Sequence, residues 1–285
     1  MVIINLSLKD LWDDRYVSLC VIAALVAVIA PLLLLFGLKN GIMTQLTQEL
    51  LNNPDIKAVK LVGNHRLDQD WIQRLATLPE VGFVVPMTRS LNTEIDLVKD
   101  SRHFIENLEM LPSSPGDPLL LNPRSQHRGA ANSIPAALIP SPKGIDEVVV
   151  SEAVAKKMQV DVGEQVRLVV TRNFQGQRER GRRVLTVVGV IPDVVYPRPV
   201  SLVSVKLLVA VEDFKDGYVV TDFGVKTGEA QPPARSQFAR VRLYARDLDD
   251  VATLEDWLQA QHIDALTQRQ EIESCLLYTS PSPRD

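Results

Sequence analysis

The chain has 285 residues, of which 46% are hydrophobic, 23% are charged and 5% are aromatic, and its formal net charge at pH 7 is −4. This composition is typical of a folded protein that is long enough for a sizeable core and for two lobes. The acidic balance argues against nucleic acid as a partner, because phosphate binding needs a basic field. The two cysteines, Cys20 and Cys275, exclude a disulfide framework and a four-thiolate metal site.

The first predicted element is a transmembrane helix that begins at Tyr16 and ends at Leu38, a run without a charged residue. As a helix it reaches roughly 34 Å, enough to cross a hydrocarbon core of about 30 Å. A cleaved signal peptide fits less well, because the run exceeds the ~15 residues of an apolar signal core and Asp13 and Asp14 precede it. Lysine and arginine are balanced on its two sides, so charge alone does not orient the helix.

This helix divides the chain into predicted segments. Residues 1–15 are predicted to be cytoplasmic, residues 16–38 to span the membrane, and residues 39–274 to form an extracytoplasmic (periplasmic) core domain. Residues 275–285, CLLYTSPSPRD, fit nothing before them and are interpreted as a non-native, adaptor-derived tail. A natural flexible tail is the alternative.

The core domain is predicted to be α+β, with a mixed sheet and short helices. Asp68 is an expected N-cap of a helix that carries Trp71, Ile72 and Leu75, and Pro86 indicates an edge strand or a bulge. Residues 112–142 are rich in Pro, Ser and Gly and are predicted to form an irregular excursion. Periodicity predicts strands over 56–62, 81–91, 148–150, 165–171, 184–190 and 238–245, and helices over 152–158 and 249–261. The pattern over 205–214 is ambiguous between strand and helix and favours a helix.

A search for chemistry-bearing motifs finds none. The sequence has no phosphate-binding P-loop, no GxSxG, no HExxH and no dinucleotide fingerprint, and its four histidines are scattered. We therefore predict no catalytic residue, no cofactor and no metal site. Two carboxylate clusters, Asp68/Asp70 and Asp247/Asp249/Asp250, precede predicted helices, where capping is a simpler explanation than a bound cation.

One basic cluster, RERGRR, begins at Arg178 and ends at Arg183. Because it lies between two predicted strands, a solvated hairpin tip is its simplest interpretation. The functional alternative is contact with lipid headgroups or with a partner.

Residues 148–194 resemble the extracytoplasmic domain of FtsX/MacB-like ABC transporter permeases. The resemblance rests on a strand that leads into an SE-x-x-A helix, a turn of the form hGE-x-V, and a strand that ends in VVGV. The matching residues are Ser151, Glu152, Ala155, Val162, Gly163, Glu164, Val166 and, within 187–190, Gly189. Simple roles follow for them: Ser151 is expected to cap the helix, Gly163 to permit the turn, and the valines to fill a sheet.

The resemblance implies that the chain is an N-terminal fragment of a permease subunit in a bacterial inner membrane. Such a subunit couples ATP hydrolysis by a separate ATPase subunit to substrate export, lipoprotein release or partner activation. Its implied partners are that ATPase, a second permease copy or paralogue, membrane lipid and a periplasmic or outer-membrane protein. The alternative is a single-pass membrane-anchored binding or sensor module. A membrane-tethered enzyme is the third alternative, and it is the least favoured because the sequence shows no catalytic constellation.

Overall fold

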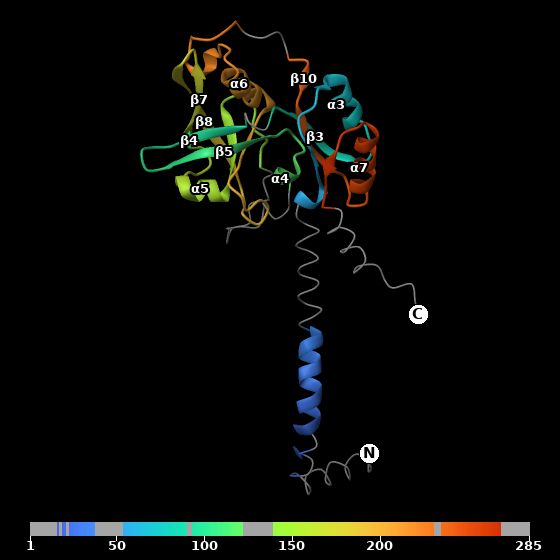
Figure 1. Cartoon of the computed structure of the whole chain (residues 1–285). Coiled ribbons are helices and arrows are strands. Elements are labelled where there is room, and N and C mark those ends of the chain that lie inside the picture. The colour runs from blue at the N-terminus through green and yellow to red at the C-terminus, as the bar shows by residue number, and fades with distance from the viewer. Residues whose placement is uncertain are drawn as a thin grey trace. The chain divides into compact units, whose positions relative to one another are not determined.

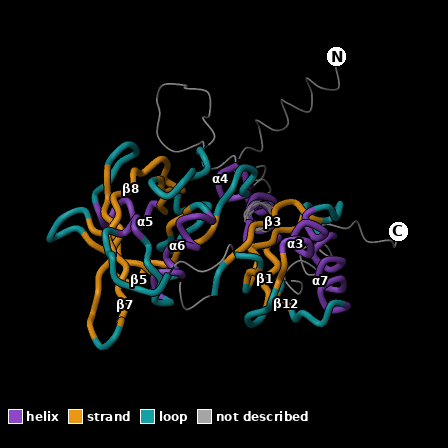
Figure 2. Tube along the Cα trace, turned by 90° about the horizontal axis from the view of Figure 1, so that it is seen from above, coloured by secondary structure: helices purple, strands orange, loops and turns teal. Residues whose placement is uncertain are grey.

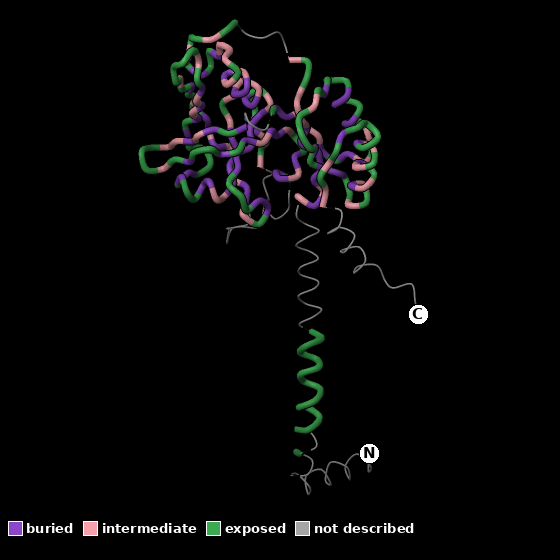
Figure 3. The backbone as a smooth tube through the Cα atoms, viewed as in Figure 1, coloured by how far each residue is buried: buried purple, intermediate pink, exposed green. Residues whose placement is uncertain are grey.

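In the computed structural model of this chain, the described residues are 16, 19–20, 23–37, 54–89, 93–121, 139–230 and 235–268. The chain divides into two compact units, Met1–Asn52 and Asn53–Asp285. In the first unit, residues 23–37 form a helix in which every residue is exposed (Figure 3).

The predicted transmembrane span from Tyr16 to Leu38 is wrong. Among the helices in the described ranges, none is both long enough and apolar enough to cross a bilayer. The same finding overturns the prediction that the chain is a single-span inner-membrane protein with a periplasmic main domain.

The second unit contains two lobes that lie side by side (Figures 1 and 2). The first, the sheet lobe, is an antiparallel sheet of order β12-β1-β11-β3 with a separate β10–β2 pair. Its elements are η1 (Pro54–Lys57), β1 (Ala58–Leu61), β2 (Leu67–Asp68), α3 (Gln69–Ala76), β3 (Val81–Met87), β10 (Gln237–Phe238), β11 (Arg240–Ala245), α7 (Asp250–Ala260) and β12 (Ala265–Leu266).

Local sequence explains how the sheet lobe begins. Asp68 accepts a hydrogen bond from the backbone N–H of Trp71 at 2.7 Å, which confirms the predicted cap of α3. The Trp71 ring lies 5.6 Å from that of Trp257, so α3 and α7 meet over the sheet. Pro86 lies in β3, an edge strand, as predicted, because proline cannot donate to a second neighbour.

The second lobe, the barrel lobe, is a six-stranded sheet that closes on itself in the order β4-β5-β9-β6-β8-β7. The β5–β9 and β6–β8 pairs are parallel and the others are antiparallel. Its elements are β4 (Glu94–Val98), β5 (Phe104–Pro112), α4 (Pro118–Leu121), β6 (Glu147–Ser151), α5 (Glu152–Met158), β7 (Gln165–Phe174), β8 (Gln177–Ile191), β9 (Ser201–Val203), α6 (Val205–Lys215) and η4 (Thr221–Phe223).

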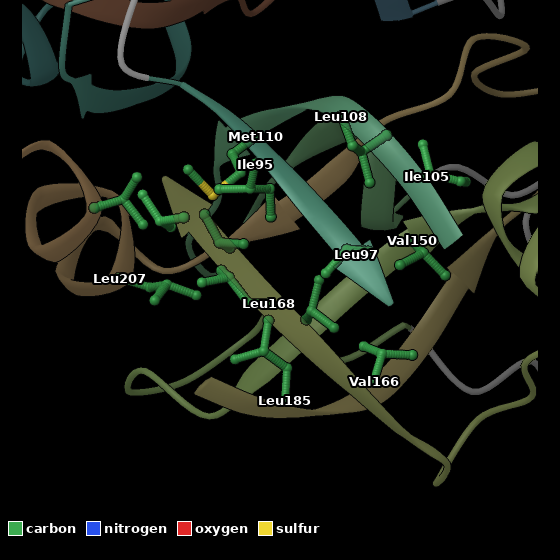
Figure 4. Packing of buried hydrophobic residues seen from close by; sticks show 14 of the residues in the cluster. Ile95, Leu97, Ile105, Leu108, Met110, Val150, Val166, Leu168, Leu185 and Leu207 are labelled. Atoms are coloured by element: carbon green, nitrogen blue, oxygen red, sulfur yellow. The ribbon is translucent and has the colours of Figure 1, made fainter. Parts of the chain in front are cut away.

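Alternating apolar side chains fill the barrel. Leu97, Leu168 and Leu185 come from three strands, are fully buried and point into the space that the strands enclose (Figure 4). The predicted fold class, an α+β core behind a transmembrane helix, is therefore wrong. The described residues form a barrel and mixed sheets with few helices, because pairing between distant strands dominates this lobe.

Several predicted elements are nonetheless found. Helix α5 has the predicted bounds, and α6 covers the predicted 205–214. Strands β7 and β8 are longer than predicted. Of the irregular stretch 112–142, residues 112–121 contain the short helix α4, while residues 122–138 lie outside the described residues. The predicted tail, 275–285, also lies outside them.

Candidate partner-binding face

The residues that carry the family resemblance have structural roles in the barrel lobe. Ser151 ends β6 and is the N-cap residue of α5, as predicted by its position. Its side chain makes no capping hydrogen bond, and the hydroxyl instead accepts from the N–H of Val200 at 3.1 Å. Glu152 accepts from the N–H of Asp193 and pairs with Lys156 at 3.0 Å. Ala155 lies at the edge of the barrel core.

Of the turn residues, Gly163 behaves as predicted, whereas Val162 lies in the turn, is exposed and does not fill the sheet. Gly163 has a φ of +94°, which favours glycine, and its N–H donates to the carbonyl of Val187 at 2.7 Å. Glu164 pairs with Lys99 at 2.9 Å, and this hydrogen bond holds the pKa of the carboxyl below its ordinary value. Val166 is buried in the barrel. Gly189 leaves no room for a side chain, because a Cβ there would lie 2.3 Å from Cγ2 of Ile139.

No family model matches the chain, and no curated protein matches its sequence. The resemblance to FtsX/MacB-like permeases therefore rests on the layout of the chain and on the specific motif over residues 148–194, and it stays a prediction. In the part of the chain that the structure describes, no group of three or more His, Cys, Asp or Glu side chains is placed to hold a metal ion.

The basic cluster is not at a hairpin tip, which corrects the prediction made for it. The tip is Gln175–Gly176, where both residues have positive φ, and the whole cluster lies within β8. A strand sends successive side chains to opposite faces, so the cluster is divided. Arg183 turns toward Asp146 and Asp222, with which it forms ion pairs.

The other arginines of the cluster share the outward face of the barrel. They lie opposite residues of β7, with Arg182 paired to Val169 and Arg180 to Thr171 in the register. Arg167 of β7 joins them on this face. We call this surface the arginine face and define it by four exposed side chains: Arg167, Arg178, Arg180 and Arg182.

These four side chains have no hydrogen bond or ion pair with any described residue, whereas Arg172 of the same hairpin is buried and donates to the carbonyls of Phe214, Tyr218 and Thr227. Side chains two residues apart on a strand are about 7 Å apart along it. That spacing is within a Debye length of about 8 Å at physiological ionic strength, so their positive fields overlap.

A groove of about 290 Å³ crosses this surface from β8 to β5. Arg180 and Arg182 line one side and Asp96 and Glu106 line the other, with the half-exposed ring of Phe104 at its end. At the adjoining β4–β5 turn, a hydrogen bond from the His103 ring and two backbone N–H groups lower the pKa of Asp100 to about 2.

The groove can hold a chain that carries separated charges and an apolar group. Acidic side chains would meet the arginines, and an apolar one would cover Phe104. The carboxylates of Asp96 and Glu106 oppose a continuous polyphosphate, so the arrangement favours a protein segment over nucleic acid. The sequence signal for this face was the spacing of Arg178, Arg180 and Arg182 at every second residue.

Proposed function

We propose that this chain is a non-catalytic subunit of an ABC transporter of the FtsX/MacB-like type. In this proposal it works with a separate ATPase subunit, and the described domain contacts a protein partner. The resemblance over residues 148–194 supports the family. The observation that carries the partner-binding role is the arginine face, whose four arginines have no partner among the described residues.

The physical argument is one of charge. An arginine exposed on a strand gives little to the folding of its own domain, and four of them beside one another repel. Their fields instead attract an acidic surface and accelerate its association. The acidic net charge of the whole chain, −4, makes this basic face a local exception rather than part of a general basic character.

The first test uses the full-length chain and a fluorescent decapeptide that carries glutamates and two leucines. Replacing both Arg180 and Arg182 with glutamine is expected to weaken binding about tenfold, which corresponds to about 1.4 kcal/mol. Raising NaCl from about 0.05 to about 0.3 M should weaken peptide binding by the unmodified chain to a similar extent, since screening shortens the range of the arginines' electric field. Fluorescence anisotropy measures both effects.

The matched control is the double substitution R66Q/R74Q, which removes two exposed arginines of the sheet lobe and is expected to leave the affinity unchanged. A decapeptide with glutamine in place of glutamate should not bind. Equal binding by R180Q/R182Q, or tighter binding of a single-stranded DNA oligonucleotide than of the acidic peptide, would contradict the role of this face.

The transporter assignment has its own test. The chain co-expressed with the ATPase encoded beside its gene is expected to co-purify as a complex that hydrolyses ATP. The chain alone is expected to hydrolyse none. Failure to form that complex would remove the transporter assignment and would leave the peptide result standing.

A further inference from the structure

A second concave site lies between the two lobes and is independent of the proposed function. We call it the interlobe cavity. It has a volume of about 190 Å³ and is bounded by β1 and β11 on one side and by β5 and Tyr196 on the other. This volume is below the ~300 Å³ at which sites for drug-sized ligands begin, so its occupant is a small molecule.

The sheet side of this cavity carries an excess of positive charge. Lys60 of β1 is the register partner of Arg242 of β11, and Arg240 lies two residues before Arg242 and so on the same face. Like charges opposite one another on adjacent strands repel. Arg242 is neutralised by Asp117, whose Oδ2 lies 2.6 Å from Nη1.

The other two cations, Lys60 and Arg240, have no carboxylate partner among the described residues. Arg240 donates through Nη2 to the carbonyl of Leu61 at 3.1 Å. Its Nε is buried and has no hydrogen-bond partner. Both residues line the cavity.

The remaining walls define the rest of the occupant. Met87, Leu111 and the buried rings of Tyr196 and Tyr244 provide apolar surface. Burial raises the pKa of Tyr196 to about 12, so its hydroxyl stays protonated and can donate a hydrogen bond.

Two carboxylates limit the charge of the occupant. Glu109 is exposed and lines the cavity, and Asp55 lies at 3.6 Å from Arg198, whose guanidinium stacks over the Tyr196 ring at 5.1 Å. A second negative charge on the occupant would be repelled by Glu109. The arrangement therefore favours one carboxylate attached to an apolar body.

We propose that the interlobe cavity binds a small organic monocarboxylate with an apolar or aromatic body. Its carboxylate contacts Arg240 and Lys60, and its body packs against Met87 and Leu111. Nothing in this assignment depends on the arginine face, which lies on the outside of the barrel and is formed by different strands.

The test uses benzoate as the probe and the full-length chain, with calorimetry at constant ionic strength. Benzoate is expected to bind, and benzamide, which has the same shape without the charge, is expected to bind at least tenfold more weakly. Replacing Arg240 with glutamine should weaken benzoate binding at least tenfold. Replacing the exposed Lys60 with glutamine should weaken it about threefold, and this variant serves if R240Q does not fold.

The control variant is R180Q/R182Q, which also removes two arginines but leaves the cavity unchanged, and its benzoate affinity should match that of the unmodified chain. Labelling the methionine methyl groups with ¹³C places the ligand. The ring of benzoate should shift the Met87 signal and leave those of Met110 and Met158, in the barrel core, unmoved. No benzoate binding, equal binding of benzamide, full affinity in both cavity variants, or an unmoved Met87 signal would overturn the proposal.

Discussion

Replacing Asp117 with alanine is expected to lower the free energy of unfolding by about 3–5 kcal/mol, because it leaves a buried guanidinium without its counter-ion. Arg242 and Asp117 are both buried and form a bidentate pair, with distances of 2.6 and 2.9 Å. Arg242 cannot avoid the free-energy cost of a buried, unpaired charge by releasing its proton, because the pKa of a guanidinium is above 12. Urea unfolding followed by circular dichroism measures the change.

The pair joins the lobes, since Arg242 is in β11 of the sheet lobe and Asp117 follows β5 of the barrel lobe. Asp117 also accepts from the Ser113 hydroxyl and from the N–H of Leu119, so its loss releases the start of α4 as well. The double variant D117A/R242M should recover part of the lost stability, because it removes both buried charges.

The matched control for this prediction is Asp247→Ala. Asp247 is largely exposed and lies 3.6 Å from Lys57, so its removal is expected to change the free energy of unfolding by less than about 1 kcal/mol. If D117A cost no more than D247A, the Arg242–Asp117 pair would not hold the lobes together.

The parts of the fold that local sequence determines were predictable. The cap at Asp68, the bounds of α5 and the edge position of β3 each depend on a few neighbouring residues. The positive φ at Gly163 was predictable for the same reason, since a glycine between two strong periodic segments indicates a turn.

The barrel was not predictable in this way. Strand β5 loses its period-two burial pattern at Asn107, which adopts a positive φ, and its register with β4 shifts between Ile95 and Leu97. Strand β9 has only three residues, and its parallel partner β5 lies about ninety positions earlier in the chain. No local pattern in the sequence therefore indicates that the barrel closes. The wrong prediction of a membrane span had a different cause, which was the strongly apolar composition of the run from Tyr16 to Leu38.

The candidate sites follow the same division. The basic cluster was visible in the sequence, but its division between two faces depends on the strand register. Arg167 belongs to the arginine face only because β7 pairs with β8. The interlobe cavity brings together residues of β1, β5 and β11, and none of them forms a motif with its neighbours in the chain.

Replacing both Arg89 and Arg235 with glutamine is expected to lower the free energy of unfolding at pH 7 by about 3 kcal/mol, because it leaves Glu212 of α6 buried without these two cations. The side chain of Glu212 is 2% exposed and accepts from Arg89 Nε at 2.8 Å and from Arg235 Nη1. Arg89 follows β3 and Arg235 precedes β10, the two places where the chain passes between the lobes. The carboxylate therefore fixes the barrel lobe to both connections.

The pH dependence distinguishes this role from simple packing. Burial opposes ionisation of Glu212, but the hydrogen bonds from Arg89 and Arg235 outweigh it and lower the pKa of the carboxyl. A lowered pKa in the folded state gives stability that is present above the ordinary pKa of about 4.5 and is lost as the pH falls through the lowered value. Without the two arginine side chains, the backbone N–H at position 89 still donates to the carboxyl, but two charged donors no longer oppose the effect of burial. We therefore expect the pKa of Glu212 to be higher in the variant than in the unmodified chain.

The double variant R89Q/R235Q should therefore gain stability relative to the unmodified chain as the pH is lowered from 7 to 5. Glu212→Gln should cost less at pH 7, about 1–3 kcal/mol, because Arg89 and Arg235 remain partly exposed and keep Asp216 and Asp213 as partners. The difference in the free energy of unfolding between Glu212→Gln and R89Q/R235Q should shrink toward pH 5, because the buried carboxyl of the double variant takes up a proton there. Urea unfolding at pH 5, 6 and 7 measures these differences, with R66Q/R74Q as the control for the loss of two cations. A constant difference across this range would show that the arginines contribute packing alone and that Glu212 does not hold the lobes through its charge.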